Sequence, residues 1–166
     1  MNNILLSPHF CLDEFTKSST AIKHGIQNNP PQEAVENLRR LCANTLEPLR
    51  EELGLPVVIT SGFRTKALND LLAHSSERSQ HMQGQAADFY VAPDQSGLSR
   101  RELLIKAFRL IITSEQIDYD QLILYPSFIH VSYVSRERNR RTILLGMRNG
   151  KLGYGKCSVQ NALKIQ

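Results

Sequence analysis

The sequence predicts an α+β fold, in which a small antiparallel sheet is flanked by helices in a single domain. Two stretches, residues 32–53 and 99–111, repeat apolar side chains at the three- and four-residue spacing of a helix with one buried face. Short β-branched or alternating runs accompany them, at residues 56–61, 120–125 and 128–133. Only two residues join the last two runs, which indicates a hairpin and therefore antiparallel strands.

Length and composition are those of a globular protein with its own core. The chain has 166 residues, 41% of them hydrophobic and 22% charged, so we expect one domain over residues 1–166. The net charge of +4 suits an anionic partner, but no basic stretch is interleaved with aromatic residues, so we expect no nucleic acid. The odd count of cysteines, Cys11, Cys42 and Cys157, predicts free thiols rather than a disulfide.

The N-terminal part leads into the first long helix. Residues 1–31 are predicted to be a loop-rich segment packed on the domain, with one helical turn at residues 12–15. The helix over residues 32–53 contains Pro48, which should kink or divide it, because proline lacks a backbone donor and clashes with the carbonyl four residues back. Gly54 is the expected helix end.

The run at residues 56–61 is β-branched and followed by glycine, which predicts a strand buried on both faces. This strand carries Arg64 just beyond its end. A helix over residues 65–73 should follow, with Thr65 as its N-cap. Its apolar residues, expected to pack beneath the Arg64 loop, are Leu68, Leu71 and Leu72.

His81 and Asp88 lie seven residues apart around Gly84, which is a pattern typical of a metal site. Two ligands of one zinc lie within roughly 4 Å of each other, whereas a helix would separate these residues by about 10 Å and a strand by roughly 23 Å. The chain must therefore turn back between them, and Gly84 is suited to such a turn. Asp88 should begin a strand.

A catalytic zinc site usually has three protein ligands and an open position. Of the five histidines, His130 is the best third candidate, because alternation in residues 128–133 fixes it on one face of a strand. A buried histidine bonded to the backbone is the alternative for His130 taken alone. Its pairing with His81 and Asp88 favours a ligand.

The remaining elements are less informative. Ser99 and Glu102 form a capping box before the second long helix. The arginine-rich stretch at residues 136–141 is interpreted as a solvated turn, with binding of an anionic glycan or lipid phosphate as the alternative. Residues 142–147 should form a last strand with a turn at residues 149–150, and the tail from residue 153 to 166 stays unassigned.

Three short motifs together resemble one known family. They are SGFR at residues 61–64, SQHMQGQAAD at residues 79–88 and IHVS at residues 129–132, and they resemble the pattern SG(F/Y)R … SxHxxGxAxD … HVS of zinc D-alanyl-D-alanine carboxypeptidases and related peptidoglycan endopeptidases. The resemblance extends from about residue 6 to residue 133. It implies the hedgehog/DD-peptidase fold and hydrolysis of peptidoglycan stem peptides.

The resemblance also implies a cofactor and roles for particular residues. One zinc ion per chain would be held by His81, Asp88 and His130, and Arg64 would be the arginine of the catalytic cleft. Arginine suits such a place because its guanidinium is a fixed fork of donors for a carboxylate or an oxyanion. The hydroxyl of Ser79 is a candidate for positioning substrate, or else a turn-stabilising group.

The sequence departs from the family at the expected general base. Several members have an acid three positions before the last histidine ligand, and Ser127 stands there. A serine hydroxyl is a poor proton acceptor near neutral pH. Asp118, Asp120 and Glu137 are the nearest acids, and Asp120 is preferred because it begins the strand next to His130, with a turn or cap residue as its alternative role. A zinc-bound hydroxide that works slowly without a base is the other possibility for an active enzyme.

The departure keeps a second function open, a non-catalytic zinc-containing module that binds wall peptides or a protein partner. The first residues lack the features of a cleavable signal peptide, and no run approaches the ~18 apolar residues of a membrane span. We therefore expect synthesis in the cytoplasm and action on the cell wall after release of the phage or prophage type.

Overall fold

A six-stranded sheet forms the centre of the computed structural model, which describes residues 4–73, 75–93, 95, 97–148 and 151–165. The strand order is β3-β4-β6-β5-β7-β8. Their bounds are β3 Val57–Ser61, β4 Ala86–Val91, β5 Gln121–Leu124, β6 Ile129–Ser132, β7 Thr142–Arg148 and β8 Lys151–Lys156. A separate two-stranded sheet joins β1 (Leu5–Ser7) to β2 (Phe10–Cys11). The predicted α+β class is confirmed, with one refinement, since β5 and β7 pair in parallel.

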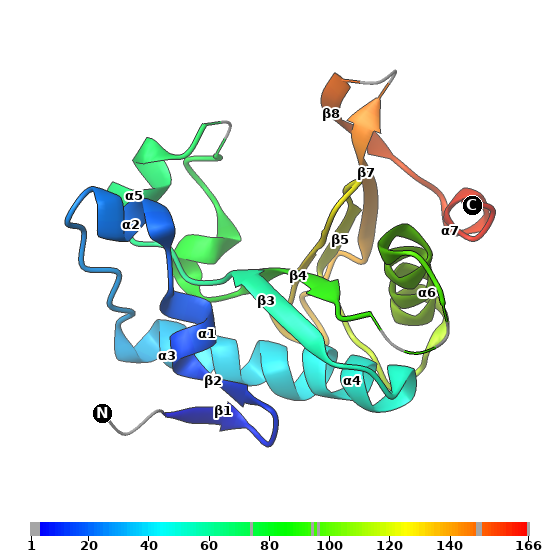
Figure 1. Ribbon diagram of the computed structural model, residues 1–166, viewed down its shortest axis with the longest axis horizontal. Coiled ribbons are helices and arrows are strands. Elements are labelled where there is room, and N and C mark those ends of the chain that lie inside the picture. The colour runs from blue at the N-terminus through cyan, green and yellow to red at the C-terminus, as the bar shows by residue number, and fades with distance from the viewer. Residues whose placement is uncertain (1–3, 74, 94, 96, 149–150, 166) are drawn as a thin grey trace.

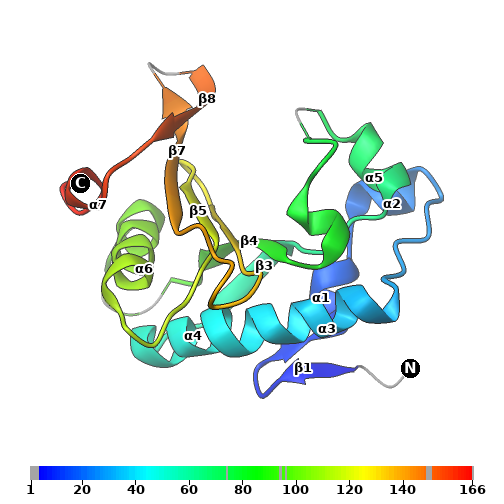
Figure 2. The same cartoon turned by 180° about the vertical axis from the view of Figure 1, so that it is seen from behind.

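Helices lie on both sides of the large sheet and along one end of it. Helix α6 (Arg100–Thr113) packs against β4 and β5. The helical run of α3 (Gln32–Leu41), η1 (Cys42–Leu46) and α4 (Glu47–Leu53) passes along the bottom of the molecule in Figure 1. On the other side of the sheet from α6 lies α5 (Lys66–Leu71), as Figures 1 and 2 both show. The core lies between the sheet, α6 and the long helical run.

Pro48 divides the first long helix, as the sequence predicts. Just before it the chain forms a π-helical turn, η1, and the carbonyl of Asn44, four residues back, is left without its helical donor. The backbone N–H of Asp118 donates to this carbonyl at 3.0 Å, and the Thr45 hydroxyl donates to the Asp118 carbonyl. The helix break therefore fixes the chain just before β5. Gly54 ends α4 with a φ of 66°.

Two predictions near Arg64 are wrong. Strand β3 is not buried on both faces, because it is the edge strand of the sheet and Thr60 is exposed. Helix α5 ends at Leu71, two residues before the predicted end, and Leu71 is 48% exposed, whereas Leu68 is buried. The predicted cap is confirmed, since the Thr65 hydroxyl accepts the Leu68 N–H.

The smaller elements complete the chain. The helical turn expected at residues 12–15 is α1 (Leu12–Thr16), and the capping box of Ser99 and Glu102 opens α6. The sequence did not predict α2 (Ser19–Lys23) or, in the tail, α7 (Val159–Ala162). Strands β7 and β8 pair antiparallel, while the turn predicted at residues 149–150 lies outside the described residues. In the described part of the chain, no helix has the length and apolar character needed to cross a membrane.

Candidate metal centre and its cleft

The structure brings His81, Asp88 and His130 together, with one ligand atom of each within 4.8 Å of the others. His130 Nδ1 is 2.8 Å from Asp88 Oδ1, His81 Nε2 is 3.3 Å from the same oxygen, and the two ring nitrogens are 3.2 Å apart. Two atoms that each lie ~2.1 Å from one tetrahedral zinc are roughly 3.4 Å apart. Two imidazoles and a carboxylate at these distances fit zinc.

Local backbone structure places two of these ligands. His81 lies in the short 3₁₀ helix η2 (Gln80–Gln83), and Gly84 ends it with a φ of 68°, so the chain turns back as predicted. A Cβ at position 84 would collide with the backbone of Ala34 in α3. Asp88 then lies in β4 directly opposite His130 in β6. Strand β4 begins two residues earlier than expected, at Ala86.

The protein environment prepares these groups for a metal. His81 Nδ1 lies 2.7 Å from the carbonyl oxygen of Gly62, so a proton on Nδ1 leaves Nε2 unprotonated and facing the cluster. Burial lowers the pKa of His81, although Asp88 opposes the shift. Burial alone would raise the pKa of Asp88, but the two histidines hold it well below its usual range. A neutral imidazole and a charged carboxylate are the forms that bind zinc.

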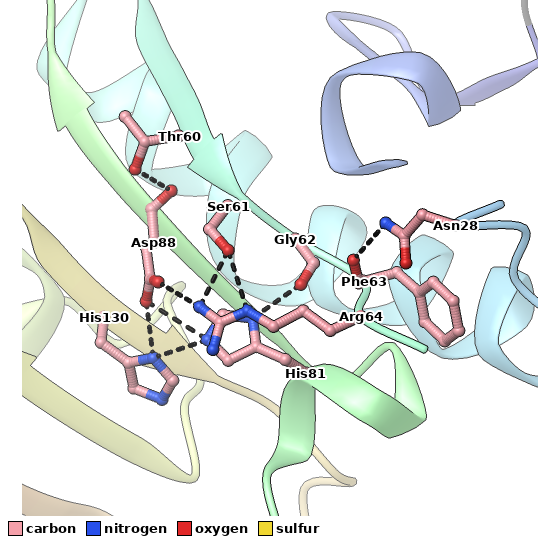
Figure 3. A network of polar contacts seen from close by, with 9 residues as sticks. All are labelled: Asn28, Thr60, Ser61, Gly62, Phe63, Arg64, His81, Asp88 and His130. Carbon is pink, nitrogen blue, oxygen red and sulfur yellow. Dashed lines mark hydrogen bonds and ion pairs between the residues drawn. The ribbon is translucent and has the colours of Figure 1, made fainter. Parts of the chain in front are cut away.

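Arg64 contacts the ligand set from the side of β3. Its Nη2 donates to Asp88 Oδ2 at 3.0 Å, and its Nε and Nη2 donate to the Ser61 hydroxyl at 3.1 and 2.8 Å. Figure 3 shows this guanidinium beside the Asp88 carboxylate and His81. The predicted place of Arg64 in the cleft is also found, since it lines the cavity described next.

An open cleft of about 1270 Å³ lies over the metal centre. Its floor is the sheet face opposite α6, where strand register aligns Asp88 with His130, His130 with Ile123, and Ile123 with Leu144. Side chains directly opposite each other on paired strands point to the same face. Asp88 and His130 therefore occupy one half of a row of side chains whose other half, Ile123 and Leu144, is apolar.

Aromatic rings extend this apolar half. Phe128 and Tyr125 stack with centroids 4.3 Å apart and line the cleft. Gly146 on β7 leaves room for the Tyr125 ring, because a Cβ there would overlap it. Alternation in residues 128–133 already places Phe128 on the face of His130, and the same two-residue spacing relates Tyr125 to Ile123 and Gly146 to Leu144. Neither ring was predicted to be part of the site.

Of the acids considered as a general base, only Asp120 lines the cleft. Its carboxylate is buried and accepts from Arg140 Nε at 2.9 Å and from Gln80 Nε2 at 2.9 Å. Burial alone would raise the pKa of Asp120, but these hydrogen bonds lower it below its usual value. Asp118 is buried beside Arg141 instead, and Glu137 is exposed and is not among the lining residues.

The other predicted positions have ordinary surroundings. Ser79 lines the cleft as the residue before η2, without a side-chain capping bond. Ser127 is exposed and lies outside the lining. Glu33, which the sequence analysis did not single out, is the third carboxylate among the described lining residues, with Asp88 and Asp120. It is far from the motifs in sequence, so no local pattern indicated it.

Comparison with known families agrees with this geometry. The sequence model of the family Peptidase M15 matches residues 8–132, which include the three ligand candidates and Arg64. A search of curated proteins gave no match. The fold and the possible metal site are those expected of a zinc metallopeptidase. This chain belongs to the Peptidase M15 family, whose peptidases depend on zinc.

Proposed function

We propose that this protein is a zinc-dependent hydrolase of peptidoglycan stem peptides. The observation that carries the proposal is the set of His81, Asp88 and His130 lining an open cleft, in a chain of the Peptidase M15 family. Zinc bound there would polarise a scissile carbonyl and activate a water molecule. The cleft is large enough for a peptide of several residues.

The residues of the chain would share the remaining tasks. His81, Asp88 and His130 hold the ion, and Gly62 orients His81. Arg64 donates from the cleft wall, where a guanidinium stabilises a substrate carboxylate or a developing oxyanion. Asp120 keeps its assignment as candidate proton acceptor, and the Ser79 hydroxyl its assignment as a group that positions substrate, because both line the cleft.

The second candidate function is a zinc-containing module that binds wall peptides without cutting them. The observation that favours it is the state of Asp120, because a carboxylate already paired with Arg140 accepts a proton poorly. The two functions share the metal site and the peptide ligand, and they differ only in turnover. Release to the wall in the phage or prophage manner remains a prediction from the sequence.

One experiment separates these possibilities. Zinc-loaded protein is incubated with purified muropeptides and cross-linked peptidoglycan fragments, and the products are analysed by mass spectrometry. Free D-alanine identifies a carboxypeptidase, and separated stem or cross-linked peptides identify an endopeptidase. Intact fragments that nevertheless bind the protein support the non-catalytic module. A protein that neither cleaves nor binds any of the fragments would contradict the proposed function.

A further inference from the structure

Positive charge remains in the cleft after the ion pairs inside it are counted. Four arginines line the cleft. Two are paired, Arg64 with Asp88 and Arg140 with Asp120. The other lining arginines are Arg78 and Arg138, and neither has a carboxylate within salt-bridge distance among the described residues. Glu33 is the remaining acid of the lining, so the cleft suits an anionic ligand.

The turn that carries Arg138 is fixed by hydrogen bonds on both sides of that residue. The Ser135 carbonyl accepts the N–H groups of Arg138 and Asn139 at 3.1 and 2.9 Å. The Asn139 side chain accepts the Val134 N–H at 2.9 Å. Such a turn holds the exposed Arg138 side chain at the rim of the cleft with little backbone freedom, which reduces the entropy lost on binding.

Arg140 anchors the same turn to the metal-site loop. Its backbone N–H and its Nε donate to Asp120 Oδ1 at 2.8 and 2.9 Å. Gln80 joins this pair, with its Nε2 2.9 Å from Asp120 Oδ2 and its Oε1 3.3 Å from Arg140 Nη2. Gln80 directly precedes the ligand His81. The buried Asp120 therefore connects the Arg138 turn with the loop that supplies a zinc ligand.

We propose that Arg138 is a specificity-determining residue that binds a free carboxylate of the peptide in the cleft. This proposal rests on the proposed function and names the substrate class, a peptide with a carboxylate at a distance from the bond held at the metal centre. A guanidinium binds a carboxylate through two parallel hydrogen bonds, and this arrangement gives direction as well as attraction. Asp120 and Arg140 are positioning residues for it.

Arg136 provides a matched control. It lies on the same turn and carries the same charge, but it is outside the cleft lining, with its side chain 72% exposed and 3.6 Å from Asp118. Arg138→Ala and Arg136→Ala therefore change the net charge equally. Only the first removes a guanidinium from the cleft, so a difference between the two variants reports on local binding.

The test measures binding of zinc-loaded protein to N-acetyl-L-Ala-γ-D-Glu-L-Lys-D-Ala-D-Ala and to the same peptide with both carboxylates amidated. Binding is measured by calorimetry on ice-cold samples, and each measurement is completed before the peptide is hydrolysed. We expect amidation to weaken binding by about tenfold in wild type and in Arg136→Ala. In Arg138→Ala the penalty of amidation should shrink by about five- to tenfold, with zinc content unchanged.

The possible failures are distinguishable. If Arg138→Ala keeps the full penalty of amidation, or if Arg136→Ala loses it equally, Arg138 is not the carboxylate site and the proposed function is unaffected. If wild type binds both peptides with equal affinity, the cleft does not select a carboxylate, and this inference alone is wrong. If wild type binds neither peptide, the proposed function fails, and this inference fails with it.

Discussion

Arg64 and the metal centre share the carboxylate of Asp88. The Arg64 guanidinium donates to Oδ2 at 3.0 Å, while Oδ1 faces the ring nitrogens of His130 and His81 at 2.8 and 3.3 Å. Arg64 therefore fixes the orientation of a ligand as well as lining the cleft (Figure 3). Residues that orient metal ligands influence metal affinity without touching the ion.

Replacing Arg64 should thus weaken zinc binding as well as turnover. We expect Arg64→Ala to lower zinc affinity by about 10- to 100-fold, as measured by competition with a chromogenic chelator. Arg78→Ala is the control, because Arg78 lines the cleft without an ion pair to a ligand. Equal zinc affinities in Arg64→Ala and wild type would show that Arg64 does not support the metal centre, and would leave it only a role toward the substrate.

Gly84 permits the turn between the first two ligands, and Gly54 offers a matched comparison. The backbone φ is 68° at Gly84 and 66° at Gly54, but only at position 84 would an added Cβ collide with the backbone of another segment. Gly54→Ala should cost about 1 kcal/mol of unfolding free energy, from the left-handed conformation alone. Gly84→Ala should cost about 3 kcal/mol.

Urea unfolding at neutral pH measures both values, with zinc removed so that metal binding does not contribute. Equal losses in the two variants would show that the Ala34 backbone gives way without cost. The zinc content of refolded Gly84→Ala then tests whether the turn still brings His81 to Asp88.

The pair of Asp120 and Arg140 should stabilise the fold in a pH-dependent way. The Asp120 side chain is 1% exposed and that of Arg140 is 57% exposed, so Arg140→Met leaves a buried charge with fewer donors. The expected loss is about 2 kcal/mol, below the value for a fully buried pair because Arg140 is screened by water. Asp120→Asn should cost less, since Arg140 can return to water.

The sign of the pH effect follows from the lowered pKa of Asp120, which burial opposes and the Arg140 hydrogen bonds produce. Stability from this shift is complete above the unfolded pKa of about 3.9 and is lost as the pH falls through the lower folded value. The stability difference between wild type and Arg140→Met should therefore be constant near neutral pH and shrink below about pH 4. A difference that grows in acid would contradict this assignment.

Asp120 and Glu33 are the described lining carboxylates that remain for proton transfer. If Asp120 is the base, Asp120→Asn should slow hydrolysis by about 10²–10⁴-fold at unchanged zinc content. Glu33→Gln is the companion variant, because it removes an exposed cleft carboxylate without disturbing the Arg140 pair. Hydrolysis that falls less than tenfold in Asp120→Asn would exclude Asp120.

The local patterns of the sequence predicted much of the fold and the ligand candidates. The caps at Thr65 and Ser99, the break at Pro48 and the turn at Gly84 depend on neighbouring residues, so the sequence indicates them directly. Alternation in residues 128–133 likewise predicts that His130 lies on one face of a strand, and that face lines the cleft. Each of these depends on spacing that a helix or a strand fixes.

Long-range contacts could not be predicted in this way. The arginine-rich stretch at residues 136–141 is an exposed turn, as the sequence predicts. Its long-range partners are not visible in local spacing, since Arg140 pairs with Asp120 across 20 residues and Gln80 reaches Asp120 across 40. The edge position of β3 depends on strand order, which a β-branched run does not encode. The parallel pairing of β5 with β7 is missed for the same reason.

The central claim is that His81, Asp88 and His130 hold one zinc ion, and metal content after purification tests it most directly. Protein dialysed against metal-free buffer is analysed by mass spectrometry for zinc per chain, with His9→Ala as the control, because His9 pairs with Glu47 away from the site. We predict about one zinc in wild type and His9→Ala, and a strong loss in His81→Ala, Asp88→Ala and His130→Ala. Undiminished zinc in His130→Ala would contradict the three-ligand site.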